Sequence, residues 1–409
     1  MVLKQLIKHR YFKITFLILL ILSIIIISII LIPSSNPKIQ KIKEILTNSD
    51  KCTAENTTFT VSPIDIENIV SIIPLGNLNP SGHTFPTDHM YYNIKTTDGN
   101  AQSPTVDVEL YAPIDATIET INVMTYKNAE PPSTDYSINF RTCENFTFYF
   151  IHTTSLSDKL LNEINLQDDD CDEYTTGGRI YQNCWQEVNI DVKAGEVIGT
   201  VGSGIRTNFD FGVTDNRIPP HTYANSERWE DSNREDMFYT VCSTNYYTDE
   251  LKAVLEIKIG DWNGNKRTID PICGTIAQDI PETAQGIWVL KGTKEVSNED
   301  PHIALVHDNI DPTIGVFSIG NSLENIGITS GTYRFNPKET GSINLDFDLI
   351  QPADDIYCYQ VAESFQGQDN NFSILISLTS ENTLLIGPYN SLECGSGSWS
   401  LNEYVEFER

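Results

Sequence analysis

Basic side chains are scarce in this sequence, in which 27 Lys and Arg residues stand against 56 Asp and Glu residues. The formal net charge is −29 at pH 7. A surface of this sign repels nucleic acid and anionic lipid, and it favours solubility or the binding of cations. Adaptation to a salty surrounding explains the same charge without any ligand. We therefore exclude nucleic acid as a partner.

Several motifs of catalysis and cofactor binding are also missing. No C-x-x-C pair occurs, which argues against a redox dithiol and against a thiolate zinc site. The chain has no P-loop and no glycine-rich dinucleotide fingerprint, so nucleotide chemistry has no support. An acidic stretch at residues 167–174 offers carboxylates to calcium, but it lacks the glycine and the ligand spacing of an EF-hand loop.

One long hydrophobic run lies near the N-terminus. Residues 14–32 carry no charge, and four Lys or Arg residues precede them within residues 1–13. A run of about 20 apolar residues can span a bilayer, and no A-x-A cleavage pattern ends this one. The pattern predicts an uncleaved single-pass anchor in the cell membrane, with residues 1–13 in the cytoplasm and a stalk over residues 33–50. The rest of the chain is then extracytoplasmic.

The eight cysteines all fall after this run. An even number of cysteines in an extracytoplasmic chain predicts disulfides. The spacing favours Cys171–Cys184 and Cys358–Cys394, and it leaves the other pairings open. Three Asn-x-Ser/Thr sequons permit N-glycosylation, at Asn56, Asn145 and Asn371.

Beyond the stalk, the chain has the pattern of a mainly β protein. Residues 105–112 alternate apolar and polar side chains, as a half-buried strand does. We predict a first β domain over residues 51–265, with a helix at residues 155–165 and a strand at residues 251–260. Short apolar strands separated by turns then predict a second all-β domain, a sandwich or small barrel, over residues 266–409.

The most informative stretch is residues 192–213, VKAGEVIGTVGSGIRTNFDFGV. It predicts two strands joined by a glycine-rich turn. In the second strand Phe209, Phe211 and Val213 share one face, and Asp210 points to the other. A carboxylate at that position is either solvated or part of a site.

The order of motifs around this stretch resembles a known family. A turn of the form A-P-x-D-A-T-I at residues 112–118 is followed by an aromatic strand that ends at His152, and then by V-K-A-G-E-V-I-G-x-V-G-S-G at residues 192–204. This order is similar to the β-sheet core of the lysostaphin/LytM-type zinc endopeptidases, the duplicated hybrid motif. The resemblance covers about residues 74–215, and it implies a peptidase-like antiparallel β domain.

The resemblance also implies a zinc site. Members of the family hold Zn²⁺ with a His and an Asp from the first loop and with the second His of an H-x-H strand, and further histidines assist catalysis. Carried over to this chain, His83, Asp88 and Asp210 are the metal ligands. His152 takes the catalytic position.

The chain departs from the family pattern at two places. Four residues separate His83 from Asp88 where the family has three, and His89 is an alternative ligand because it adjoins Asp88. Asn208-Phe209-Asp210 stands in place of H-x-H, and an asparagine cannot accept and return a proton. One imidazole and two carboxylates can still bind a divalent cation.

These observations lead to two main hypotheses of function. In the first, a membrane-anchored extracytoplasmic protein has a peptidase-like domain that has lost catalysis and binds a cell-envelope peptide, glycan or protein. In the second, the chain is a divergent zinc endopeptidase that acts on cell-envelope peptides. A carbohydrate- or lipid-binding role for the second domain, which contains Trp288 and Trp399, is a third option. Each candidate site residue also has a structural explanation, as a turn cap, a strand end or a solvated strand position.

Overall fold

The computed structural model describes residues 51–100, 103–129, 133–166, 171–202, 208–232, 234–361, 363–364 and 372–409. The predicted tail, anchor and stalk lie outside the described residues, as do residues 167–170 of the acidic stretch, residues 203–207 of the glycine-rich turn and the sequon at Asn371. In the described part of the chain, no helix is long and apolar enough to cross a membrane. Residues 54–409 form one compact unit, which contains both sheets.

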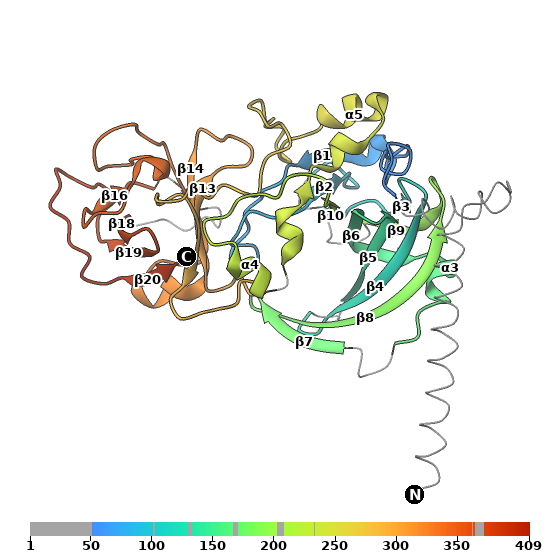
Figure 1. The fold of residues 1–409 in the computed structure, drawn as a ribbon, viewed down its shortest axis with the longest axis horizontal. Coiled ribbons are helices and arrows are strands. Elements are labelled where there is room, and N and C mark those ends of the chain that lie inside the picture. The colour runs from blue at the N-terminus through green and yellow to red at the C-terminus, as the bar shows by residue number, and fades with distance from the viewer. Residues whose placement is uncertain are drawn as a thin grey trace, which may run out of the picture. The chain divides into compact units, whose positions relative to one another are not determined.

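The fold is mainly β, with two antiparallel sheets (Figure 1). In the described residues the first sheet consists of β1 (Ile69–Ile73), β2 (Met90–Ile94), β3 (Val108–Tyr111), β4 (Ala116–Tyr126), β5 (Ser133–Cys143), β6 (Phe146–Leu156), β7 (Cys171–Thr176), β8 (Arg179–Val192), β9 (Val197–Val201), β10 (Asn208–Asp215) and β11 (Thr240–Val241). The strand order is β1-β2-β10-β6-β5-β4-β8-β7. Strand β9 pairs with β3 and β6, and β11 pairs with β10.

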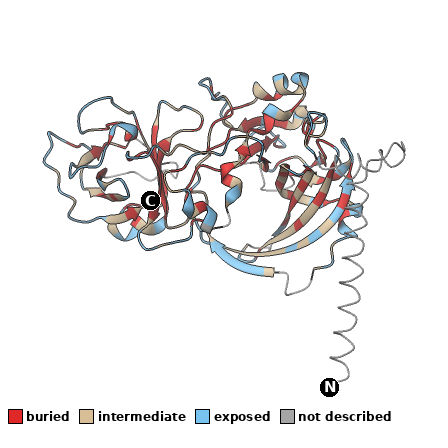
Figure 2. Cartoon of the chain, viewed as in Figure 1, coloured by how far each residue is buried: buried red, intermediate tan, exposed pale blue. Residues whose placement is uncertain are grey.

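One face of the first sheet is apolar and forms a core. Phe148 and Phe150 of β6 and Phe209 and Phe211 of β10 are at most 1 % exposed, because alternate residues of a strand point to the same face. Figure 2 shows buried residues along the inner strands of the first sheet and a mostly exposed edge strand β7. The prediction that Asp210 points away from the phenylalanines of β10 is confirmed. Asp210 is nevertheless 2 % exposed, so a solvated position for this carboxylate is wrong.

The second sheet follows in the chain and has a core of its own. In the described residues its strands are β12 (Gly286–Leu290), β13 (Ile303–His307), β14 (Gly315–Ile319), β15 (Gly331–Phe335), β16 (Tyr357–Tyr359), β17 (Glu363–Ser364), β18 (Ser373–Ser380), β19 (Thr383–Tyr389) and β20 (Val405–Glu408). Their order is β16-β18-β19-β20-β12-β13-β14-β15-β17. The core contains Trp288, Phe317, Tyr333 and Phe347, all fully buried.

Helices are short in the described chain: η1 (Ile66–Asn68), α3 (Asp158–Leu161), α4 (Glu227–Asp231), η3 (Glu235–Phe238), η4 (Ser243–Tyr246), α5 (Asp249–Glu256), η5 (Asn321–Ile326) and η6 (Phe347–Leu349). The helix predicted at residues 155–165 is present only as α3. The strand predicted at residues 251–260 is wrong, because α5 occupies most of it. Asp249 and Glu250 lie in the first turn of α5, where negative charge stabilises a helix. Ile257 is 71 % exposed, so the alternating apolar positions do not share a buried face.

All eight cysteines lie in the described residues, and all are paired. The predicted bonds Cys171–Cys184 and Cys358–Cys394 are confirmed. Because disulfides persist in oxidising compartments, this pairing indicates an extracellular protein.

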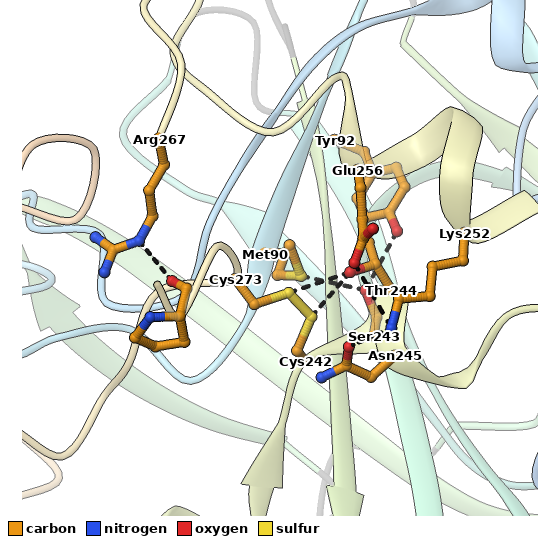
Figure 3. The surroundings of a disulfide bond; sticks show 11 residues. Met90, Tyr92, Cys242, Ser243, Thr244, Asn245, Lys252, Glu256, Arg267 and Cys273 are labelled. Atoms are coloured by element: carbon orange, nitrogen blue, oxygen red, sulfur yellow. Dashed lines mark hydrogen bonds and ion pairs between the residues drawn. A yellow bond between two sulfur atoms is a disulfide. The ribbon is translucent and has the colours of Figure 1, made fainter. Parts of the chain in front are cut away.

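A third disulfide joins Cys242, just after β11, to Cys273. Figure 3 shows the Thr244 hydroxyl beside both sulfur atoms, at 2.9 and 3.1 Å. The N–H of Leu75 donates to the carbonyl of Cys273 at 2.9 Å. The disulfide therefore joins the segment after β11 to Cys273, whose backbone hydrogen-bonds to the start of the loop between β1 and β2.

Candidate functional site

The loop between β1 and β2 carries three candidate site residues, His83, Asp88 and His89. Asn79 and His83 exchange two backbone hydrogen bonds, at 2.8 and 2.9 Å, which close the loop. The rings of His83 and His89 meet edge to face, with centroids 5.6 Å apart. The loop thus presents two imidazoles and a carboxylate in one place.

His152 reaches the same place through a β-bulge in β6. Between the pairs Tyr136–Thr153 and Ile138–Phe150, strand β5 has one residue and β6 has two, Ile151 and His152. An extra residue of this kind re-aims a side chain. His152 has a φ of +67°. This backbone conformation is unfavourable for any residue with a side chain, and residues that adopt it are concentrated at functional sites. Without the bulge, His152 would point to the same face as Phe150.

Asp210 of β10 lies between two imidazole rings. Its Oδ2 is 3.5 Å from Nε2 of His89 and 3.5 Å from Nε2 of His152. Its Oδ1 accepts a hydrogen bond from Nδ2 of Asn208 at 3.1 Å. The polar face of β10 therefore contributes an amide and a carboxylate to the site, two residues apart on one face.

Each of these two rings is oriented by a second carboxylate. Nδ1 of His89 is 2.8 Å from Oδ1 of Asp88, and Nδ1 of His152 is 2.8 Å from Oδ2 of Asp135. An ionised carboxylate only accepts hydrogen bonds, so Nδ1 of each ring carries a proton. In a neutral ring Nε2 then presents a lone pair to Asp210, and two acceptors repel each other. A proton or another cation between Asp210 and the rings would therefore remove this repulsion.

The surroundings of His89 favour such a proton on its ring. Burial alone would lower its pKa, but the charge of Asp210 and the hydrogen bond to Asp88 raise the pKa of His89 above its ordinary value. Burial opposes ionisation of Asp88, yet the hydrogen bond from His89 and the charges of His89 and Arg234 lower the pKa of Asp88 on balance. Burial, together with the positive charge of His89, lowers the pKa of His83 to about 4. His83 is thus neutral at pH 7.

A pocket of about 310 Å³ opens beside these side chains. Its volume is at the lower end of small-ligand sites, which run from about 300 to 1,000 Å³. Its walls come from the site loop, from the polar face of β4 to β6 and from two later segments: His83, Pro86, Thr87, Asp88, His89, Asn122, Ser137, Asn139, Tyr149, Ile151, Arg234, Asp236 and Glu299.

The two later segments contribute charged side chains to the pocket. Nη2 of Arg234 lies 3.4 Å from Oδ2 of Asp88, and Nε of Arg234 lies 3.4 Å from Oδ1 of Asp236. Oε2 of Glu299 accepts a hydrogen bond from the N–H of Phe85 at 2.8 Å. Burial raises the pKa of Glu299 to about 7, although the charge of Arg234 opposes the shift. Burial likewise raises the pKa of Asp236 against Arg234.

Comparison with known proteins gives no family for this chain. No family model matches it, and no curated protein matches it. The interpretation of the site therefore depends on its geometry.

The four residues predicted from the sequence lie in one cluster, but not as a ligand set. The charges of Asp88, His152 and Asp210 all act on His83. In the described ranges, no group of three or more His, Cys, Asp or Glu side chains is placed to hold a metal ion. Both oxygens of Asp88 face cationic partners, His89 and Arg234. The zinc site and the catalytic role of His152 stay predictions.

Sequence reasoning missed four charged residues of the site, Asp135, Arg234, Asp236 and Glu299. Asp135 could have been found, because it alternates with the apolar positions of β5. Arg234 and Asp236 lie in and beside the short helix η3, which has no distinctive pattern. Glu299 contacts Phe85 across 214 positions of sequence, and no local pattern predicts such a contact.

Proposed function

We propose that this chain is an extracytoplasmic protein, anchored in the cell membrane by residues 14–32, whose first sheet is a peptidase-like domain that binds a cell-envelope peptide without cleaving it. The support is positional. The segments that resemble the LytM-type core carry His83, Asp88, His152 and Asp210, and these residues lie together beside a polar pocket. The disulfides agree with an extracellular location.

The state of Asp88 is the observation that carries this proposal. A carboxylate that binds a catalytic metal ion must have an oxygen that is free to coordinate the metal. Here Oδ1 faces His89 at 2.8 Å and Oδ2 faces Arg234 at 3.4 Å, so both oxygens already have cationic partners. The amide of Asn208 also replaces an imidazole that could exchange a proton.

A divergent zinc endopeptidase is the second candidate, and a separate observation favours it. Two Asp-oriented rings, His89 and His152, face Asp210 at 3.5 Å each. Ligands of a tetrahedral zinc ion bound at about 2.0 to 2.1 Å stand about 3.4 Å from one another. Nε2 of His89 is buried and has no hydrogen-bond partner. These two histidines and Asp210, rather than the set His83, Asp88 and Asp210 that the resemblance implies, would have to move together to hold a zinc ion, which when bound polarises a carbonyl and activates water.

One set of measurements separates the two candidates. The full chain is purified in detergent, its metal content is measured by mass spectrometry, and short peptides are tested for binding by calorimetry and for cleavage by chromatography. We expect binding without products and without stoichiometric metal. Stoichiometric zinc, together with turnover that is lost in Asp88→Ala and in Asp210→Ala, would establish the endopeptidase instead. If no peptide binds, the proposed binding function is wrong.

A further inference from the structure

Glu299 brings a carboxylate from the segment between β12 and β13 to the pocket of the first sheet. Its Oε2 accepts the hydrogen bond of Phe85 at 2.8 Å. The next residue, Asp300, accepts from the Thr176 hydroxyl at 2.7 Å. The ring of His302 stacks on Phe85, with centroids 5.5 Å apart and planes 5° apart. Contacts with two parts of the first sheet therefore hold Glu299 in place as a wall of the pocket.

The charges that line the pocket do not balance. His89 pairs with Asp88, and Arg234 is shared between Asp88 and Asp236 at 3.4 Å each. In the part of the chain that the structure describes, no basic side chain forms an ion pair with Glu299. Asp236 and Glu299 both line the pocket. This side of the pocket has more acceptors than donors.

A neutral acceptor lines the same pocket. Oδ1 of Asn122, in β4, is buried and has no hydrogen-bond partner. Buried polar atoms are rarely left without a partner, and each exception calls for an explanation such as a missing ligand. Two carboxylates and an amide oxygen match an ammonium group, which has three donors and no acceptor.

We infer that the pocket recognises its ligand through a primary ammonium group, with Glu299 as the residue that determines specificity. Asp236 and Glu299 accept from the ammonium group, and Asn122 takes a further hydrogen bond. The group is either the α-amine or a lysine-type side chain of a peptide. This inference rests on the proposed function, because it takes the ligand to be a peptide that binds without cleavage. The net charge of −29 steers such a cation toward the protein.

The test uses the full chain in detergent and four peptide probes in calorimetry at pH 8. The probes are Ala-Lys-Ala, its N-acetylated form, Ala-norleucine-Ala, and N-acetylated Ala-norleucine-Ala, which has no amine. We expect the last probe to bind at least about tenfold more weakly than the best of the other three, since a charge-assisted contact is lost. The acetylated lysine probe and the free norleucine probe show whether the side chain or the α-amine is recognised.

Glu299→Gln is the decisive variant, because glutamine keeps an oxygen for the N–H of Phe85. We expect it to weaken the best amine probe about tenfold and to leave the amine-free probe unchanged. Glu381→Gln is the matched control, since Glu381 is exposed in the turn between β18 and β19 and does not line the pocket; its affinities should stay within about twofold. If the amine-free probe binds as tightly as the others, or if Glu299→Gln weakens all probes equally, the inference is wrong and peptide binding stands. If no probe binds, the proposed function and the inference both fail.

Discussion

Replacing Asp210 by asparagine tests the charge pairing at the centre of the site. The carboxylate is 2 % exposed and faces His89 and His152 at 3.5 Å each. At an effective dielectric constant of about 20, one pair of unit charges at this separation attracts by about 5 kcal/mol, before the cost of desolvation. Removing one partner of a buried pair costs about 3 to 5 kcal/mol. We expect Asp210→Asn to lower the free energy of unfolding by about 3 kcal/mol at pH 6.

The size of this loss depends on pH through His89. Burial works against its protonation, but Asp210 and Asp88 raise the pKa of His89 on balance. A raised pKa in the folded state gives stability that is fully present below the unfolded pKa of about 6.5 and is lost as the pH rises through the folded pKa. The difference between the wild type and Asp210→Asn is therefore expected to be largest near about pH 6 and to shrink toward about pH 10.

The assay is chemical denaturation of the full chain in detergent at both pH values, followed by tryptophan fluorescence. Asp172→Asn is the control, since Asp172 is an exposed residue of β7, and it should change stability by less than about 0.5 kcal/mol. An equal loss at both pH values would refute the protonated pair of His89 and Asp210. A loss no larger than that of the control at pH 6 would refute charge pairing at the site altogether.

Four further predictions follow from the same geometry. His152→Gly should be about 1 kcal/mol more stable than His152→Ala in denaturation, since the φ of +67° strains only the residue with a side chain; equal stabilities would contradict a strained bulge. Gly212→Ala should weaken peptide binding in calorimetry, because a Cβ there meets the ring of Tyr149, which lines the pocket; unchanged binding would show that Tyr149 is not needed. The double variant Cys358→Ser/Cys394→Ser should lose about 4 kcal/mol of stability, as the separation of 36 residues predicts; a negligible loss would contradict it. EDTA should leave peptide binding unchanged, and loss of binding after EDTA would favour the zinc site.

The position of Asp210 could be predicted from the sequence because β10 is a regular strand. The alternation of Phe209 and Phe211 with Asp210 assigns the faces without any tertiary information. The pairings Cys171–Cys184 and Cys358–Cys394 were equally accessible, because each closes a short span of chain. Predictions of this kind use only local regularity, and the structure confirms them.

The rest of the site depends on irregular backbone and on long-range contacts. His152 has the same parity as Phe148 and Phe150, so alternation assigns it to the core, and only the bulge turns it to Asp210. Asp88 and His89 are neighbours that a strand would point apart, but they precede β2 in a bend and hydrogen-bond to each other.

The bulge in β6 has a consequence for the detection of relatives of this chain. Two residues stand between Phe150 and Thr153 where the partner strand has one. A protein with one residue fewer at this point would keep the strand order and the aromatic core, and its single residue there would alternate regularly with Phe150. Strand length at this point therefore shows whether a homologue has the bulge, and an alignment that closes this single-residue gap would hide that difference.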